Sequence, residues 1–310
     1  MNAEADNNIE TVGVYGTPPN ELVDVSAQAT QFSPLIPGSA ALEDCAKSSL
    51  TSMTILAPPG TLERRTVLAQ ALLALQPGST LVALAPKDRG GTRLRKELEA
   101  FGCAVEETAR RHHRVVTCTR PAEPIGLDEA LADGGPRIDD ALGLWTQPGV
   151  FSWDRLDPGT ALLIEHLPPL AGRGADFGCG IGLLAHAALT SPAVTQLTLV
   201  DVDRRAIACA QHNITDARAR FMWADLRRDL SDLAELDFVV MNAPFHDAGG
   251  EDKALAQSFV KRAAASLRKG GVCWLVANRH LPYEAAMQPL FKRVDLKLET
   301  GAFKIYEARK

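Results

Sequence analysis

A glycine-rich loop that opens with a carboxylate is the clearest ligand-binding feature of the sequence. Residues 176–182 read Asp-Phe-Gly-Cys-Gly-Ile-Gly, between a predicted strand at 174–177 and a predicted helix that begins near Leu183. Glycines in this context let backbone N–H groups approach a ligand closely. The loop has no third glycine at the spacing that serves a pyrophosphate in the dinucleotide pattern, and its leading carboxylate suits an adenosine-type ligand that carries an amino acid and a cation. It therefore predicts a nucleoside ligand, with a tight strand–helix turn as the alternative.

Two more carboxylates follow the next predicted strands. Asp201 ends the second strand, about 20 residues past the glycines, where a carboxylate can accept both hydroxyls of a ribose. Asp203 is expected to face elsewhere and to cap the helix that follows it. Ala224 and Asp225 come after a third, short strand, and the Asp225 carboxylate either accepts from an adenine amino group or caps a helix. These positions predict contacts to the ribose and the base of one ligand.

The segment Asn242-Ala243-Pro244-Phe245 ends a further predicted strand, at the edge where doubly wound sheets do their chemistry. The exocyclic amine of a purine is a poor nucleophile because its lone pair is delocalised into the ring. The amide oxygen of Asn242 and the carbonyl of Ala243 could accept its two hydrogens, while Phe245 stacks on the base. The residue types therefore predict amine chemistry, with a proline-containing loop around a buried phenylalanine as the alternative.

The elements that would position these residues alternate between strands and helices. Over residues 141–310 this alternation ends in two strands, at 293–298 and 303–308, with no crossover between them. The pattern predicts an α/β fold with a doubly wound, mostly parallel sheet and a terminal antiparallel hairpin. Residues 49–140 have the same texture without a glycine loop, which predicts a second Rossmann-like domain. Residues 1–48 lack sustained periodicity and predict an acidic, disordered arm.

Charge and composition exclude several classes of protein. The 310-residue chain has a net charge of −5 and no apolar run near the roughly 20 residues that cross a bilayer. Residues 1–50 carry seven acids against Lys47, a balance of −6, so the remainder has a net charge of +1 and is compatible with RNA. The six scattered cysteines form no C-x-x-C pair, and no metal site is expected. The N-terminus has no signal-peptide pattern, so we expect a cytoplasmic protein, with a monomer favoured.

A basic stretch lies in the first half of the chain. Residues 87–120 contain nine Lys and Arg residues against five acids, and Arg110, Arg111 and Arg114 form the densest cluster. Such a stretch could bind an RNA backbone. A solvated helix face is an equally good interpretation of the same charges.

The motifs described above resemble those of a class I S-adenosylmethionine-dependent methyltransferase of the Asn-Pro-Pro-Phe type, which methylates amines. Three further segments are similar to the bacterial 16S rRNA guanine-N2 methyltransferases: 148–160, 276–283 and 301–306. In that family a degenerate methyltransferase-like half precedes a catalytic half. This chain has Ala243 where the family has its first proline, which retains the carbonyl but loses the ring's restriction of φ.

The resemblance implies direct methyl transfer from S-adenosylmethionine to the N2 amine of a guanine in RNA, with 16S rRNA as the expected substrate. The cofactor-binding residues that it implies are Asp176, Gly178, Gly180, Asp201, Ala224, Asp225 and Asn242. The catalytic residues that it implies are Asn242, Ala243, Pro244 and Phe245. Two alternatives stay open: methylation of a protein glutamine amide, which poses the same lone-pair problem, and a cofactor-binding protein that has lost catalysis and binds RNA.

Overall fold

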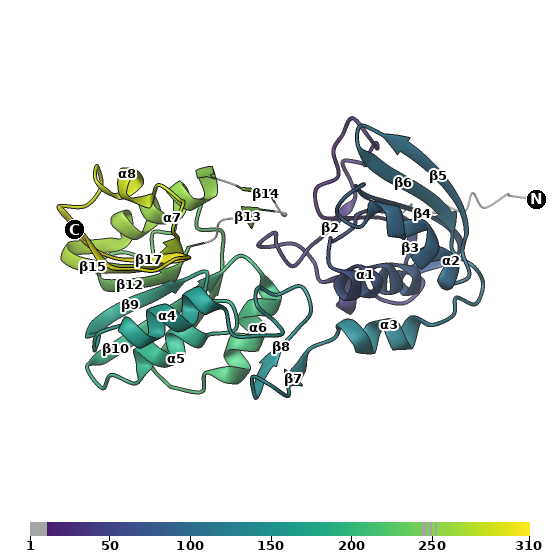
Figure 1. Cartoon of the computed structure of the whole chain (residues 1–310). Coiled ribbons are helices and arrows are strands. Elements are labelled where there is room, and N and C mark those ends of the chain that lie inside the picture. The colour runs from purple at the N-terminus through teal and green to yellow at the C-terminus, as the bar shows by residue number, and fades with distance from the viewer. Residues whose placement is uncertain (1–10, 244–245, 248–249, 252) are drawn as a thin grey trace, which may run out of the picture. The chain divides into compact units, whose positions relative to one another are not determined.

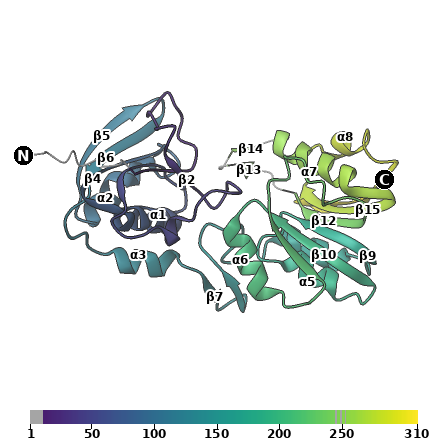
Figure 2. The ribbon, with the colours of Figure 1, turned by 180° about the vertical axis from the view of Figure 1, so that it is seen from behind.

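Two compact units make up the chain. The computed structural model describes residues 11–243, 246–247, 250–251 and 253–310, and the side chains of residues 246–253 lie outside that description. The units are Met1–Gly135 and Pro136–Lys310 (Figures 1 and 2). The division falls a few residues before the expected boundary at 140, because helix α3 (Leu127–Gly134) packs on α1 (Thr61–Ala74) within the first unit.

The C-terminal unit contains a seven-stranded sheet in the order β11-β10-β9-β12-β15-β17-β16. Its strands are β9 (Gly172–Phe177), β10 (Val194–Asp201), β11 (Ala219–Trp223), β12 (Leu236–Asn242), β15 (Leu267–Asn278), β16 (Arg293–Glu299) and β17 (Phe303–Arg309). Its helices are α4 (Pro158–His166), α5 (Leu183–Leu189), α6 (Arg204–Asn213), α7 (Lys253–Ser266) and α8 (Tyr283–Met287). The strands from β11 to β15 are parallel, whereas β17 is antiparallel to both of its neighbours. The predicted doubly wound sheet with a terminal hairpin is confirmed.

Helices cover both faces of this sheet (Figure 1). Val239 and Met241 of β12 pack in one apolar core with α7 and α8. Phe238 and Val240 of the same strand pack in another core with α4, α5 and α6. Because successive residues of a strand point to opposite faces, a strand buried on both sides is a continuous apolar run. The polar residues therefore come at the strand ends, where the candidate site lies.

The N-terminal unit contains a six-stranded sheet in the order β2-β1-β3-β4-β6-β5. Its strands are β1 (Val12–Tyr15), β2 (Thr30–Phe32), β3 (Leu50–Leu56), β4 (Leu75–Pro86), β5 (Ala104–Arg110) and β6 (His113–Thr119). Its helices are α1, α2 (Leu94–Ala100) and α3, with short 3₁₀ turns η1 (Leu42–Asp44) and η2 (Gly91–Arg93). Two small ribbons belong to the C-terminal unit: β7 (Arg137–Asp139) with β8 (Leu144–Thr146), and β13 (His246–Asp247) with β14 (Gly250–Glu251).

The disordered arm expected at 1–48 is wrong for residues 11–48. Strands β1 and β2 form one edge of the N-terminal sheet, and both run parallel to their neighbours. Tyr15, Phe32 and Leu42 are buried in its core. These strands are only four and three residues long, too short for a period to emerge from the sequence, and they are held in the sheet because β1 pairs with β3 and β2 pairs with β1. Residues 1–10 lie outside the described residues.

The basic cluster around Arg110 is a β-hairpin tip, so the helix face considered for it is wrong. Strands β5 and β6 pair antiparallel, and Arg111 and His112 form the turn with φ values of +43° and +62°. Arg114 pairs with Glu107 at 3.2 Å. Arg120, at the other end of the stretch, is buried and donates to Leu72 O, so it serves the fold of this unit.

Candidate active site

Strand register brings the predicted motifs of the C-terminal unit to one edge of its sheet. In the parallel sheet, β9 lies between β10 and β12, with Phe177 paired to Val200 and Asp176 paired to Val240. Asp201 ends β10 and Asn242 ends β12. The loops after these strands therefore start at nearly the same height, at the carboxyl edge where ligands bind in such sheets.

The glycine loop after β9 contacts Asp201 through its backbone. The Gly180 N–H donates to Asp201 Oδ2 at 2.9 Å. Gly180 is buried, has a φ of +53°, and a Cβ added to it would meet nothing within 4 Å. This left-handed conformation suits glycine, which has no Cβ to strain it. The open space beside this buried glycine leaves room for the predicted ligand.

Asp176 is a buried carboxylate with no donor at full hydrogen-bond distance among the described residues, although the backbone N–H of Ala185 lies close enough to lower its pKa in part. Its side chain is fully buried, and among the described residues neither of its oxygens has a hydrogen-bond partner. Burial, followed by the charge of Asp201, raises the pKa of Asp176 to about 8. Because a buried acceptor without a donor is costly, a cation that donates hydrogen bonds would be stabilised here. The ammonium of S-adenosylmethionine is such a group, so this residue fits the cofactor implied by the resemblance.

Asp201 and Asp203 have different partners, and the cap expected from Asp203 is confirmed. Asp201 accepts from the N–H groups of Gly180 and Asp203, both at 2.9 Å, and burial raises its pKa to about 6. Each carboxylate oxygen can accept a second hydrogen bond, so Asp201 can still accept from a ribose. Asp203 instead caps α6 and forms an ion pair with Arg205 at 2.8 Å.

The third predicted pair is less open to a ligand. Ala224 is buried, and its N–H donates to the Asp201 carbonyl at 2.9 Å, which places it beside the ribose-binding candidate. Asp225 accepts from the Arg227 N–H and from Arg227 Nε, both at 2.9 Å. An adenine amino group would have to share this carboxylate with Arg227. Adenine binding by Asp225 stays a prediction.

Asn242 is held by residues to which the sequence assigned no role. Its Nδ2 donates to Asp157 Oδ2 at 2.7 Å and to Thr160 Oγ1 at 2.9 Å. Asp157 is the N-cap of α4 and also accepts from the Thr160 N–H. The Asp-Pro-Gly-Thr sequence at 157–160 is a recognisable helix start, but nothing in it points to a residue more than 80 positions away.

The remaining catalytic candidates are only partly described. Ala243 is buried, and its N–H donates to the Val276 carbonyl at 3.4 Å. Pro244 and Phe245 lie outside the described residues, so their predicted roles stay predictions. Among the described residues no helix is long and apolar enough to span a membrane, and no group of three or more His, Cys, Asp or Glu residues could hold a metal ion.

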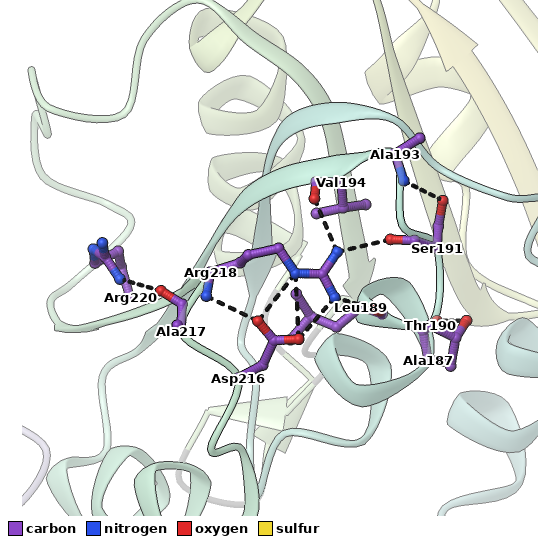
Figure 3. Close-up of polar contacts among 10 residues, drawn as sticks. All are labelled: Ala187, Leu189, Thr190, Ser191, Ala193, Val194, Asp216, Ala217, Arg218 and Arg220. Atoms are coloured by element: carbon purple, nitrogen blue, oxygen red, sulfur yellow. Dashed lines mark hydrogen bonds and ion pairs between the residues drawn. The ribbon is translucent and has the colours of Figure 1, made fainter.

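A separate polar cluster fixes the opposite, amino-terminal edge of the sheet (Figure 3). The Arg218 guanidinium donates to the carbonyls of Leu189, Ser191 and Val194, at 2.6–2.9 Å. Arg218 also forms an ion pair with Asp216 at 2.7 Å. The hydrogen bonds that Arg218 donates to the Asp216 carboxylate lower the pKa of Asp216 to about 2. The cluster ties the end of α5 to the start of β10, away from the candidate site.

Comparison with known proteins agrees with this geometry. The family model described as "methyltransferase small domain" matches residues 141–307. A protein of Pseudomonas entomophila named "Ribosomal RNA small subunit methyltransferase C" is 35% identical over 261 residues, which cover 82% of this chain and 78% of that protein. Its namesake from Pseudomonas paraeruginosa is 32% identical over 92% of this chain and 87% of its own length.

A solved structure shows the same fold over nearly the whole chain. It is the 16S rRNA guanine-N2 methyltransferase of T. thermophilus in complex with AdoMet and guanosine, and it is 23% identical with a TM-score of 0.78. The match covers 97% of this chain and 88% of that protein. The chain therefore belongs to the family of class I methyltransferases whose members are named ribosomal RNA small subunit methyltransferase C, as the sequence motifs predicted.

Proposed function

We propose that this protein transfers a methyl group from S-adenosylmethionine to N2 of a guanine in 16S rRNA. The observation that carries the proposal is the state of Asn242. A carboxamide has two N–H groups, and both of those on Asn242 are bonded to protein oxygens. Its oxygen is the group left for a substrate, which suits a substrate that donates, such as an amine. The names of the three relatives described above specify small-subunit ribosomal RNA, and they supply the class of substrate.

Each residue of the site has a distinct task in this proposal. Asp176 binds the cofactor ammonium and Asp201 its ribose. The bound cofactor supplies an electrophilic methyl group on a positively charged sulfur. Asn242 Oδ1 and the Ala243 carbonyl accept the two hydrogens of the guanine amine, which draws its lone pair out of conjugation with the ring. No strong base is required, because the amine loses its extra proton readily once the methyl group is attached.

The test is incubation of purified 16S rRNA or small subunits, isolated from cells that lack the gene, with the protein and S-adenosylmethionine. Nucleoside mass spectrometry should show N2-methylguanosine, and sequencing of the fragment should locate a single site. Asn242→Ala is the matched negative control. Methylation of another base or atom, or no methylation of either substrate, would contradict the proposal. A methylated glutamine in a ribosomal protein would instead support the protein-amide alternative.

A further inference from the structure

We infer that Asp157 and Thr160 are positioning residues for methyl transfer, because they fix which end of the Asn242 carboxamide meets the substrate. The inference rests on the proposed function and assigns two residues to which neither the motif nor the comparisons give a role. Both lie at the start of α4, whereas Asn242 ends β12. The contact therefore joins segments that are distant in sequence within the C-terminal unit.

Geometry makes the orientation of the carboxamide unambiguous. An ionised carboxylate only accepts hydrogen bonds. Asp157 Oδ2 lies 2.7 Å from Asn242 Nδ2, and rotating the amide by half a turn would place its oxygen against the carboxylate instead. Thr160 Oγ1 takes the second N–H at 2.9 Å. Without these partners the amide could present its N–H groups to the substrate amine, a donor facing a donor.

The start of α4 is built to hold this contact. Asp157 Oδ2 also accepts from the Thr160 N–H at 2.8 Å, so the cap fixes the carboxylate, and Thr160 is buried. Gly159 leaves room for it: a Cβ there would lie 3.0 Å from Asp157 Oδ2 and 3.0 Å from the Phe303 ring. The same carboxylate therefore serves the helix and the catalytic amide.

The charge of Asp157 also acts on the acceptor. A hydrogen bond from an amide N–H to a carboxylate is charge-assisted, and hydrogen bonds in series polarise one another. Electron density in the conjugated amide shifts toward Oδ1, which makes that oxygen a stronger acceptor for the amine. A side chain with a neutral acceptor should keep the orientation and lose only this second effect.

The experiment separates positioning from helix stability. Asp157→Ser keeps an N-cap oxygen for the Thr160 N–H but is too short to hold Asn242, so single-turnover methylation should fall about tenfold or more while cofactor affinity stays within about threefold. Asp157→Asn keeps an acceptor of full length and should recover most of that loss. Thr160→Val should lose rate and Thr160→Ser should retain it. If Asp157→Ser has the wild-type rate, or both aspartate variants lose it equally, the inference is overturned.

A double-mutant cycle shows whether Asp157 acts through Asn242. In the Asn242→Ala background, Asp157→Ser should cost nothing further, whereas an independent structural effect would multiply the two losses. Exchange of the Asn242 side-chain N–H protons, followed by NMR, should be slow in the wild type and fast in Asp157→Ser, independently of turnover. Fast exchange in the wild type would overturn the inference. Failure of the wild type to make N2-methylguanosine would overturn the proposed function alone.

Discussion

The two halves of the chain follow one plan with different outcomes. In the N-terminal half the order β3-α1-β4-α2-β5-β6 gives neighbours β3-β4-β6-β5, and in the C-terminal half β12-α7-β15-α8-β16-β17 gives β12-β15-β17-β16. Even the lengths correspond. Helices α1 and α7 have 14 residues each, β4 and β15 have 12 each, and all four hairpin strands have seven. This correspondence supports a duplicated methyltransferase-like unit.

The differences lie at the strand ends. The glycine loop and α5 connect β9 to β10, whereas the described residues 16–29 between β1 and β2 form no helix. At the end of β12 the sequence is Asn242-Ala243-Pro244, and at the matching end of β3 it is Leu56-Ala57-Pro58. A leucine cannot accept the hydrogens of an amine. The N-terminal half therefore has a similar framework, with Leu56 where the C-terminal half has Asn242.

A buried ion pair supports the loop that follows β3 in the N-terminal half, which matches the loop after β12 in the C-terminal half. Arg64 of α1 is fully buried and forms two hydrogen bonds of 2.7 Å with the Glu97 carboxylate. It also donates to the carbonyls of Pro58 and Pro59, directly after β3. The loop after β3 is thus satisfied internally. The two halves thus differ at this loop: Asn242 follows β12 in one, and in the other Arg64 donates to the carbonyls that follow β3.

The largest expected effect is on the stability of the N-terminal half. Arg64→Ala leaves the buried Glu97 carboxylate unpaired, so we expect this half to lose about 3–5 kcal/mol of its free energy of unfolding. Hydrogen exchange of the α1 amides at increasing urea concentration measures this loss of stability. The paired change Arg64→Met with Glu97→Leu should recover most of that loss. If the single variant is as stable as the wild type, the ion pair does not hold the loop closed.

The next effect separates the two matching loop positions. Asn242→Ala should lower the single-turnover methylation rate by about a hundredfold or more and leave cofactor affinity within a few fold, the scale expected for a lost preorganised contact. The matched control is Leu56→Ala in the other half, which should leave the rate unchanged at a temperature where the variant is folded. Equal rates for Asn242→Ala and the wild type would show that the amide does not act on the amine.

The buried carboxylate of Asp176 should make both stability and cofactor affinity depend on pH. Its pKa in the free protein is about 8, above the ordinary value of 3.8, so the free protein loses stability as pH rises from about 4 to about 8. A cofactor ammonium favours the carboxylate, so cofactor affinity should rise by about thirtyfold between pH 5.5 and 7, below the range where the ligand's own amino group titrates. Calorimetry measures this rise. Asp176→Asn should leave only the smaller rise due to Asp201, whose pKa is about 6, and a flat profile in the wild type would contradict the assignment.

Sequence reasoning found what is local and missed what depends on distant contacts. The glycine loop, Asp201 and the Asp203 cap each lie within a few residues of the strand or helix that defines them. Asp157 bonds to Asn242, which is distant in sequence, and Arg64 bonds to the carbonyls after β3 only once the chain is folded. Helix periodicity alone places Asp157 at a helix start and Arg64 on a helix face. The strand β5 was missed because it is an exposed edge strand, in which polar residues on both faces hide the alternation.

The smallest expected effect concerns the exposed cations of the N-terminal half. The tip of its β5–β6 hairpin exposes Arg110 and Arg111, and the ion pair of the Arg111 guanidinium with Glu21 is exposed and long, at 3.6 Å. Exposed pairs of this kind contribute little, so these cations remain available to phosphates. If they contact RNA, replacing both with Ala should reduce the slope of log affinity against log salt by nearly one for each lost contact.

The matched control for that measurement is Arg95→Ala, since Arg95 is an exposed cation in an i,i+4 pair with Glu99 on α2 and is not part of the hairpin turn. It should leave the salt slope unchanged, and cofactor affinity should be unaffected in every variant because that site lies in the C-terminal half. An unchanged slope in the Arg110→Ala, Arg111→Ala double variant would show that the tip is only a solvated turn. RNA recognition would then rest on the C-terminal half, and the Arg64–Glu97 ion pair would serve only the folding of the N-terminal half.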